Sequence, residues 1–365
     1  MGDKDIELKV SGRRDFFKTA SVGLAAGGAL LASGRQAVAR TLTEKDKLSR
    51  IASNTWPVRS LYKRRPGGRP PSEDALKMKE KYGEITMLDM AQFTKDRWPG
   101  VYHMDLWSGL FGDVTDDSMF SERTFTRGER TRTVHEFDPT TTSGKKWLDK
   151  LANTNEAAGV RCHHVSNNAP RNISDFDTEK RKAGIAVARH WLDASAQLGA
   201  KTMRVNTGGP RVAPCAVADQ GYPKNDEVVK YLNLCIESFK EMADYGGKVG
   251  VKVTIENHWG LSADPMLIRI ILDEVNHPFC EASPDFCNWE HEYHLYHGLK
   301  ALVPYTTSIV HAKYWDRWAE VDVQRCVRIM IDGGYKGIFA LEYEHGPWDG
   351  VEGMNYLFKE VMAAL

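Results

Sequence analysis

Residues 226–257, DEVVKYLNLCIESFKEMADYGGKVGVKVTIEN, decide the fold. Apolar residues first recur at the 3.6-residue spacing of an amphipathic helix, Gly250 then ends that segment, and a short β-type run follows. The run leads directly to Glu256, and a carboxylate at the end of an apolar strand is costly to bury unless a partner replaces its lost hydration. The stretch therefore predicts one helix–strand unit with a charged group at the carboxyl end of the strand.

The same unit recurs along the chain. A second segment with helical spacing, residues 178–199, also ends at a glycine, and short β-type runs alternate with such segments. Eight alternating units predict an α/β fold, specifically a single-domain (β/α)8 TIM barrel. A doubly wound open sheet is the alternative, but no G-x-G-x-x-G follows the first strand. The predicted strands are residues 50–56, 101–107, 160–165, 202–206, 251–257, 279–285, 307–313 and 337–343.

Three other segments need an interpretation. Residues 62–74 form a loop rich in Pro, Gly and Arg, and residues 109–144 are a long polar insertion after the second strand. Loops that follow barrel strands lie over the mouth, so the insertion fits a lid, a subunit contact or a surface excursion equally well. The stretch at 85–98 is predicted to be mostly helical, because a strand there would make nine.

The first 39 residues have the features of an export signal. Paired Arg13 and Arg14, a weakly apolar run at 20–33 and an A-x-A ending at Ala39 resemble a twin-arginine signal peptide. This resemblance predicts a periplasmic or exported protein that is cleaved after Ala39, with the barrel over residues 40–365. The apolar run is too short to span a bilayer comfortably, so no stable membrane span is expected.

The composition points to a small-molecule partner. The chain has 49 basic and 49 acidic residues, so neither a nucleic acid nor an anionic membrane surface has electrostatic support. The six cysteines form no C-x-x-C pair and no zinc-finger spacing. Disulfides are compatible with export but are not required for a chain of this length.

Ligand-type side chains stand near the carboxyl ends of the last four predicted strands. Their separations of 29, 26 and 31 residues match the roughly 30 residues of one βα unit. Strand alternation directs the carboxylates toward the barrel axis, where two unit charges about 4 Å apart repel by ~4 kcal/mol even at an effective dielectric of 20. A divalent cation resolves that repulsion, whereas each residue taken alone could equally be a salt-bridged rim group. The predicted metal ligands are Glu256, Asp285, His311 and Glu342.

An oxygen-rich ligand set with one nitrogen favours Mn²⁺, with Mg²⁺, Co²⁺, Fe²⁺ and Zn²⁺ also compatible. Such a site suits removal of a proton from carbon beside a carbonyl, through a metal-bound enediolate. Return of the proton on the opposite face is epimerisation, transfer to the neighbouring carbon is isomerisation, and loss of a β-substituent is elimination. The site residues do not choose among these outcomes.

The segments IENHWGLS, PDFCN, VHAK and LEYE, with Arg317 six residues after His311, resemble the xylose isomerase-like barrel superfamily. Within it, they are similar to the sugar phosphate isomerase/epimerase group, which includes ketose 3-epimerases and inosose dehydratase. It is this family resemblance that implies an isomerase or epimerase acting on a keto-sugar, polyol or glycoside, with a dehydratase or lyase as the alternative. The resemblance covers about residues 48–365 and implies one bound Mn²⁺-type ion, Glu256 and Glu342 as the acid/base pair, and a homodimer or homotetramer. Ketose 3-epimerases carry D-x-x-H where this chain has Asp285 to Asn288, and Asn288 can hydrogen-bond a substrate hydroxyl but cannot take a proton.

Several further residues are candidates for the site. Lys313 shares a strand face with His311 and is predicted to act as an acid or an electrostatic clamp, although a solvated lysine would look the same in sequence. Glu344 has the same parity as Glu342 and is its substitute. The predicted substrate-binding residues are His164, His258, Asn288 and Arg317, and the aromatic side chains that could stack on a sugar are Trp56, Trp107 and Trp259.

Two other function classes stay open. A nuclease of the endonuclease IV type shares the barrel, but it relies on additional histidine ligands and a basic groove that this sequence lacks. A non-catalytic sugar-binding barrel would keep the four ligands without turnover.

Overall fold

The computed structural model describes residues 42–66, 70–127, 130–170, 172–209, 225–319 and 321–365, except for the side chains of 125–127, 130, 132, 225 and 226. Residues Thr43–Leu365 form one compact unit. The predicted export signal, residues 1–39, lies outside the described part of the chain.

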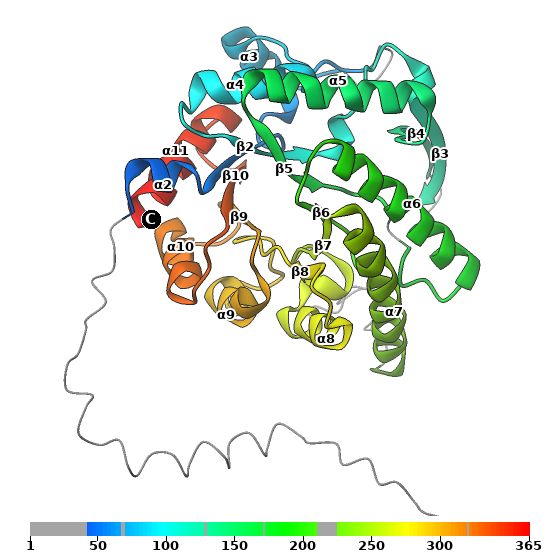
Figure 1. Cartoon of the computed structure of the whole chain (residues 1–365). Coiled ribbons are helices and arrows are strands. Elements are labelled where there is room, and N and C mark those ends of the chain that lie inside the picture. The colour runs from blue at the N-terminus through cyan, green and yellow to red at the C-terminus, as the bar shows by residue number, and fades with distance from the viewer. Residues whose placement is uncertain (1–41, 67–69, 128–129, 171, 210–224, 320) are drawn as a thin grey trace, which may run out of the picture. The chain divides into compact units, whose positions relative to one another are not determined.

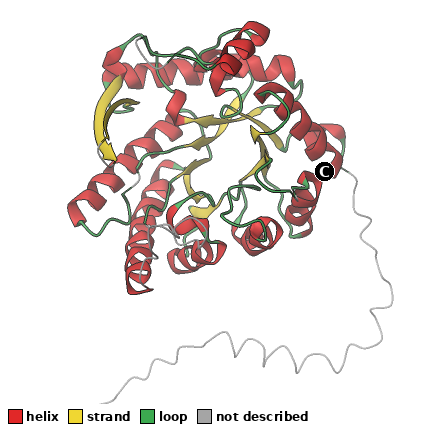
Figure 2. Cartoon of the chain, turned by 180° about the vertical axis from the view of Figure 1, so that it is seen from behind, coloured by secondary structure: helices red, strands yellow, loops and turns green. Residues whose placement is uncertain are grey.

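Eight parallel strands curl into a barrel inside a layer of helices, which confirms the predicted TIM barrel (Figures 1 and 2). All eight predicted strands are present in the predicted order. The helices follow the strands in alternation and cover the outside of the sheet (Figure 2). The strands are β1 (Ile51–Asn54), β2 (His103–Trp107), β5 (Arg161–Ser166), β6 (Thr202–Arg204), β7 (Lys252–Ile255), β8 (Cys280–Ala282), β9 (Ile309–Trp315) and β10 (Ile338–His345).

Local sequence sets the helix boundaries. At α8, the Asp264 side chain accepts the amide hydrogen of Met266, Pro265 occupies the first turn, and Asn276 ends the helix in the left-handed conformation at φ 43°. The segment at 85–98 is mostly helical, as predicted. The described helices are α2 (Glu44–Leu48), α3 (Glu73–Tyr82), α4 (Met90–Arg97), α5 (Thr142–Ala158), α6 (Thr178–Gln197), α7 (Asn225–Val249), α8 (Pro265–Val275), α9 (His294–Leu302), α10 (Val323–Asp332) and α11 (Gly350–Ala364).

The main hydrophobic core lies between the strands and the helices, and a small second cluster lies inside the barrel. This second cluster contains Ala52, Ile309, Ile338 and Ala340, which are all buried and share their strand faces with the polar residues nearer the carboxyl ends. The barrel interior is therefore closed by apolar side chains, and the polar groups lie above them at the mouth.

The barrel closes between β8 and β9 through a single bridge. The hydrogen-bonded strand order runs β8-β7-β6-β5-β2-β1-β10-β9, so β8 and β9 are its two ends. Asp285 and His311 form an isolated parallel bridge between them. The His311 amide donates to the Pro284 carbonyl at 2.9 Å, and the Phe286 amide donates to the His311 carbonyl at 3.1 Å. Two of the predicted metal ligands thus form the seam of the barrel.

The insertion at 109–144 contains an antiparallel hairpin that the sequence prediction did not include. Strands β3 (Phe120–Arg127) and β4 (Arg130–Phe137) pair along their full length. Phe137 is buried and packs against Trp147 of α5 and Trp191 of α6, with ring centroids 5.2 and 6.0 Å away. The described end of the hairpin is therefore anchored on the outer helices.

Predictions about membrane spans and disulfides were also drawn from the sequence, and the described residues bear on both. Within them, no helix is both long and apolar enough to cross a bilayer. The five cysteines among them are unpaired, and four of these thiols are buried.

Candidate metal centre

Polar side chains from most of the barrel strands meet at the carboxyl end of the sheet. Glu256 directly follows β7, Asp285 follows β8, and His311 lies in β9. One ligand atom from each of these three residues lies within 4.8 Å of the others, and all three side chains are buried. This spacing allows one cation to contact all three.

Local hydrogen bonds fix the orientation of Asp285. Its Oδ1 accepts the amide hydrogens of Cys287 and Asn288 at 2.6 and 2.9 Å. Its own amide donates to Asn257 Oδ1 at 2.7 Å. Oδ2 has no hydrogen-bond partner although it is buried. One carboxylate oxygen is therefore fully used by the backbone, and the other is directed into the cluster without a donor.

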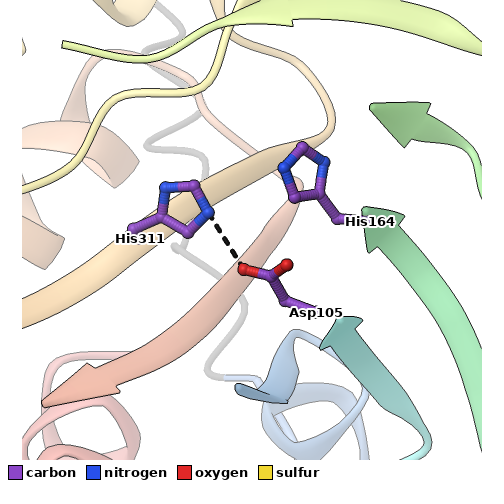
Figure 3. A group of neighbouring side chains, drawn as sticks. All are labelled: Asp105, His164 and His311. Carbon is purple, nitrogen blue, oxygen red and sulfur yellow. Dashed lines mark hydrogen bonds and ion pairs between the residues drawn. The ribbon is translucent and has the colours of Figure 1, made fainter. Parts of the chain in front are cut away.

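His311 connects the cluster to a second group of buried side chains, which Figure 3 shows. Its Nε2 lies 3.0 Å from Asp105 Oδ2, and its Nδ1 lies 3.5 Å from Glu256 Oε2 without a hydrogen bond. Asp105 also accepts a hydrogen bond from Asn54 Nδ2 at 2.8 Å. A carboxylate that accepts the Nε2 hydrogen leaves the Nδ1 lone pair available, which is the arrangement found for metal-binding histidines.

His164 lies beside this pair. One ligand atom each from Asp105, His164 and His311 come within 4.8 Å of one another, and all three residues are fully buried. His164 Nδ1 is 2.8 Å from Thr202 Oγ1, while Nε2 has no hydrogen-bond partner among the described residues. Burial lowers the pKa of His164 to about 3, so its imidazole is neutral. His164 lies in this cluster at the barrel mouth, whereas His163 lines a separate cavity at the amino ends of the strands.

Two cations lie within the carboxylate cluster. Arg204, at the end of β6, donates from Nη1 to Glu256 Oε2 at 2.5 Å and is held by Asn167 and Asn168. Lys313 Nζ lies 2.9 Å from Glu342 Oε1, 3.2 Å from Glu344 Oε2 and 3.4 Å from Asp285 Oδ2. The sequence prediction included Lys313 but not Arg204.

These two cations do not balance the buried acids. Five carboxylates surround them, from Asp105, Glu256, Asp285, Glu342 and Glu344, and Arg59 lies 3.7 Å from Glu344, so two negative charges remain when His311 is neutral. The pKa values of Asp285 and His311 reflect this excess of negative charge. Burial raises the pKa of Asp285 to about 7 despite the opposing charge of Lys313. Burial alone would lower the pKa of His311, but Glu256 and Asp105 outweigh it and raise this pKa to about 10.

A divalent cation fits this site. The Oδ2 of Asp285 and the Nδ1 of His311, which make no hydrogen bond, are oxygen and nitrogen donors of the kind that Mn²⁺ and Mg²⁺ accept, and a charge of +2 would balance the remaining carboxylates. Glu342, the predicted fourth ligand, is instead bound by Lys313 and by Asn54 Nδ2, which lies 3.2 Å from its Oε2. The structure thus brings three of the four predicted ligands together, and metal binding by Glu342 stays a prediction.

Above the cluster lies a cavity of about 270 Å³, here called the inner pocket. Its lining includes the predicted site residues His258, Asn288, Lys313 and Glu342, together with Glu344. Trp56, Trp107, Trp259 and Trp315 form much of its rim. Among the described side chains of 109–144, none lines it, so the described part of the insertion is not its lid.

The remaining predicted substrate contacts differ in position. Asn288 is buried and links Glu256 to Lys313, since its Nδ2 donates to Glu256 Oε1 at 2.8 Å and its Oδ1 accepts from Lys313 at 3.0 Å. His258 is half-buried, and burial lowers its pKa to about 3. Arg317 is exposed and stacks on Trp315 and Trp318, with its guanidinium carbon 4.6 and 4.3 Å from the ring centroids. Arg317 does not line the inner pocket, and its contact with substrate stays a prediction.

Comparison with known proteins places the fold in a family. The description "Xylose isomerase-like TIM barrel" matches residues 126–360, which is more than half of the chain. The chain belongs to this family. None of the curated protein sequences matches the chain.

Solved structures support the xylose isomerase-like assignment at the level of the fold. A 3-keto-D-glucoside 4-epimerase from E. coli is 12% identical with a TM-score of 0.54, over 85% of this chain and 98% of its own. A xylose isomerase-like TIM barrel protein from Mycobacterium smegmatis, in complex with magnesium, is 16% identical with a TM-score of 0.53, over 87% and 98%. An L-ribulose 3-epimerase is 10% identical with a TM-score of 0.55, over 87% and 95%.

Proposed function

We propose that this protein is a metal-dependent sugar isomerase or epimerase that acts on a keto-sugar, polyol or glycoside. It removes a proton from carbon beside a carbonyl group, which in a polyol or glycoside must be present as a keto function. The observation that carries the proposal is the convergence of Glu256, Asp285 and His311 with two donor atoms that have no protein hydrogen bond. Several solved structures with this fold are sugar epimerases by name, which supports the substrate class.

Glu256, Asp285 and His311 would hold the ion, with Glu342 as the predicted fourth ligand. We expect Mn²⁺, and the same donors would accept Mg²⁺, Co²⁺, Fe²⁺ or Zn²⁺. When bound there, the ion stabilises the negative charge that develops on substrate oxygens during proton removal.

The protein groups around the inner pocket would have distinct roles. Glu342 lines this pocket, which suits it to take the proton, and Lys313 at 2.9 Å can stabilise or supply a proton to the developing anion. Asn288 and His258 reach the same cavity and would hydrogen-bond substrate hydroxyls. The tryptophan rim offers apolar faces to a sugar ring.

Elimination by a dehydratase or lyase is the second candidate. It is favoured by the Lys313 ammonium in the inner pocket, because loss of a hydroxyl or glycosidic oxygen needs an acid at the leaving group. The presence of Asn288 where ketose 3-epimerases carry a histidine removes one proton-transferring group from that pattern.

We also propose that the protein is exported. The support is the twin-arginine pattern at Arg13 and Arg14 with the A-x-A ending at Ala39. Expression of the full chain with cell fractionation, and N-terminal sequencing of the product, test both the location and the cleavage point.

The function is tested by metal analysis together with solvent exchange. The protein would be stripped with a chelator, reloaded with each ion, and incubated in D₂O with a panel of ketoses and 3-keto-glucosides. We expect deuterium at a carbon beside the carbonyl only in the metal-loaded samples. A protein that retains no divalent ion and exchanges no substrate in the panel would exclude the proposal.

A further inference from the structure

The inner pocket at the barrel mouth has a larger neighbouring cavity. It adjoins a second cavity of about 860 Å³, here called the outer groove, and Trp107 and Glu344 line both. At about 270 Å³ the inner pocket is at the low end for small-molecule sites, which suits one sugar ring. The outer groove is about three times as large, so a bound molecule has room to continue past the reacting ring.

The junction between the two cavities is held in place by several contacts. Glu344 Oε2 accepts a hydrogen bond from Trp56 Nε1 at 2.5 Å and lies 3.2 Å from Lys313 Nζ in the inner pocket. Glu344 Oε1 lies 3.7 Å from Arg59 Nη2, and Arg59 lines the outer groove. The Trp56 and Trp107 rings meet edge to face with centroids 4.7 Å apart. A rigid polar and aromatic wall of this kind can position a ligand that crosses it.

The outer groove also has an aromatic surface of its own. Trp348 lines it and is 37% exposed, so part of its indole ring is accessible from the groove. Its ring is held by stacking on Tyr356 at a centroid distance of 4.5 Å. A fixed, accessible indole face suits the apolar face of a second sugar ring.

The outer groove carries more basic than acidic side chains, which favours an extended ligand with a negative charge. Its lining contains five Lys or Arg residues against three Asp or Glu residues. Two of the acids are paired within the groove, Glu344 with Arg59 and Asp349 with Lys81 at 2.9 Å. Lys63 is exposed, and although its charge acts on Asp113, no described carboxylate lies within ion-pair distance of it. It also lines a neighbouring cavity of about 610 Å³, where five Lys or Arg residues face two Asp residues.

We propose, building on the function proposed above, that the substrate is a glycoside rather than a free monosaccharide. Its reacting ring occupies the inner pocket, and its second unit lies in the outer groove and carries a carboxylate, as in a uronic acid. Lys63 supplies the charge that recognises this carboxylate, and Trp348 supplies the stacking surface.

Calorimetric binding to the metal-loaded full chain tests this inference. The ligands are methyl β-D-glucoside, methyl β-D-glucuronide, and glucosyl and glucuronosyl disaccharides of glucose in each of the common linkages. We expect at least one glucuronosyl disaccharide to bind about tenfold more tightly than both its neutral counterpart and the methyl glycosides, at low ionic strength only. The inference is overturned if no acidic disaccharide exceeds its neutral counterpart.

Charge reversal provides the matched variants. Lys63→Glu should weaken binding of the acidic disaccharide by about fivefold or more and leave binding of methyl β-D-glucoside unchanged. Lys182→Glu, on the exposed surface of α6, should change neither. An equal loss in both lysine variants, or none in Lys63→Glu, would contradict the assignment of the groove.

Solvent deuterium exchange separates this inference from the proposed function. Exchange into monosaccharide ketoses without any preference for acidic disaccharides would reject the outer groove and leave the proposed chemistry standing. Preference for acidic disaccharides without exchange in any keto-sugar would reject the chemistry and support the groove as a binding site.

Discussion

Replacement of Asp105 by asparagine should weaken metal binding, although Asp105 is not a predicted ligand. Asp105 is fully buried, and its Oδ2 lies 3.0 Å from His311 Nε2. As a carboxylate it can only accept, so it holds the imidazole hydrogen on Nε2 and leaves Nδ1 free toward Glu256 and Asp285. An asparagine amide can present its NH₂ group instead, which would favour the tautomer with the hydrogen on Nδ1, where the cation is expected to bind.

The expected size of the effect follows from this hydrogen bond. Loss of a carboxylate that orients a metal-binding histidine costs about 10- to 100-fold in metal affinity, which is roughly 1.4 to 2.7 kcal/mol. Mn²⁺ titration followed by electron paramagnetic resonance of the free ion measures it. The variant should also lower the stability of the metal-free protein, because Asp105 Oδ2 contacts both Asn54 and His311 in a fully buried arrangement, so Mn²⁺ affinity is compared under conditions where both proteins are folded.

A second buried carboxylate provides the control. Glu281 in β8 is 5% exposed and binds Lys252 at 2.8 Å, and no contact joins it to the cluster. Glu281→Gln should therefore lower stability without changing Mn²⁺ affinity. Unchanged affinity in Asp105→Asn, or the same loss in both variants, would refute the assignment of Asp105 as the residue that positions His311.

Three further predictions follow from the site and the fold. Glu342→Gln should reduce solvent deuterium exchange by at least about 100-fold while sugar binding persists, and unchanged exchange would contradict its role as the base. Mg²⁺ at about 100 times its Kd should stabilise the folded protein by roughly 2.7 kcal/mol. It should also slow hydrogen exchange at the His311 and Phe286 amides, which close the barrel. Thermal unfolding that Mg²⁺ leaves unaltered would contradict a metal at the seam. Burial lowers the pKa of His163 to about 4, so below pH ~6.5 the unfolded chain takes up a proton that the folded chain does not. Stability should then fall by about 2 kcal/mol between pH 6.5 and 5 through this group, and urea unfolding of His163→Gln should show a smaller loss over that range.

The barrel could be predicted because its signals are local and repeated. Each strand is a short apolar run, and glycines such as Gly199 and Gly250 end the preceding helices with φ near 75°. The carboxyl ends of parallel strands meet at one rim, so the approach of Glu256, Asp285 and His311 also followed from order and spacing. The β3–β4 hairpin was missed although the Gly-Glu pair in its connection can signal a turn, because its strands are polar and lack a regular apolar alternation.

Two site residues were missed although the sequence contained a usable signal. Asp105 lies between Met104 and Leu106, and Arg204 lies between Met203 and Val205. In both strands the apolar neighbours face the helices, so alternation directs the charged side chain toward the axis. The partner that each charge contacts could not be predicted, because the link from Arg204 to Glu256 depends on side-chain conformations at the end of neighbouring strands.

The unequal partners of Glu256 and Glu342 bear on which reaction the site can perform. Epimerisation with return of the proton to the opposite face needs a second proton-transferring group, and Glu256 is the predicted candidate. Burial would raise the pKa of Glu256, but the Arg204 guanidinium outweighs burial and holds this pKa below its ordinary range. An arginine stays charged, so this contact continuously opposes protonation of Glu256. Glu342, in contrast, contacts Lys313, whose single charge is shared with two other carboxylates. Isomerisation and elimination need only one mobile base, and Arg204 therefore favours these two outcomes unless the substrate displaces it from Glu256.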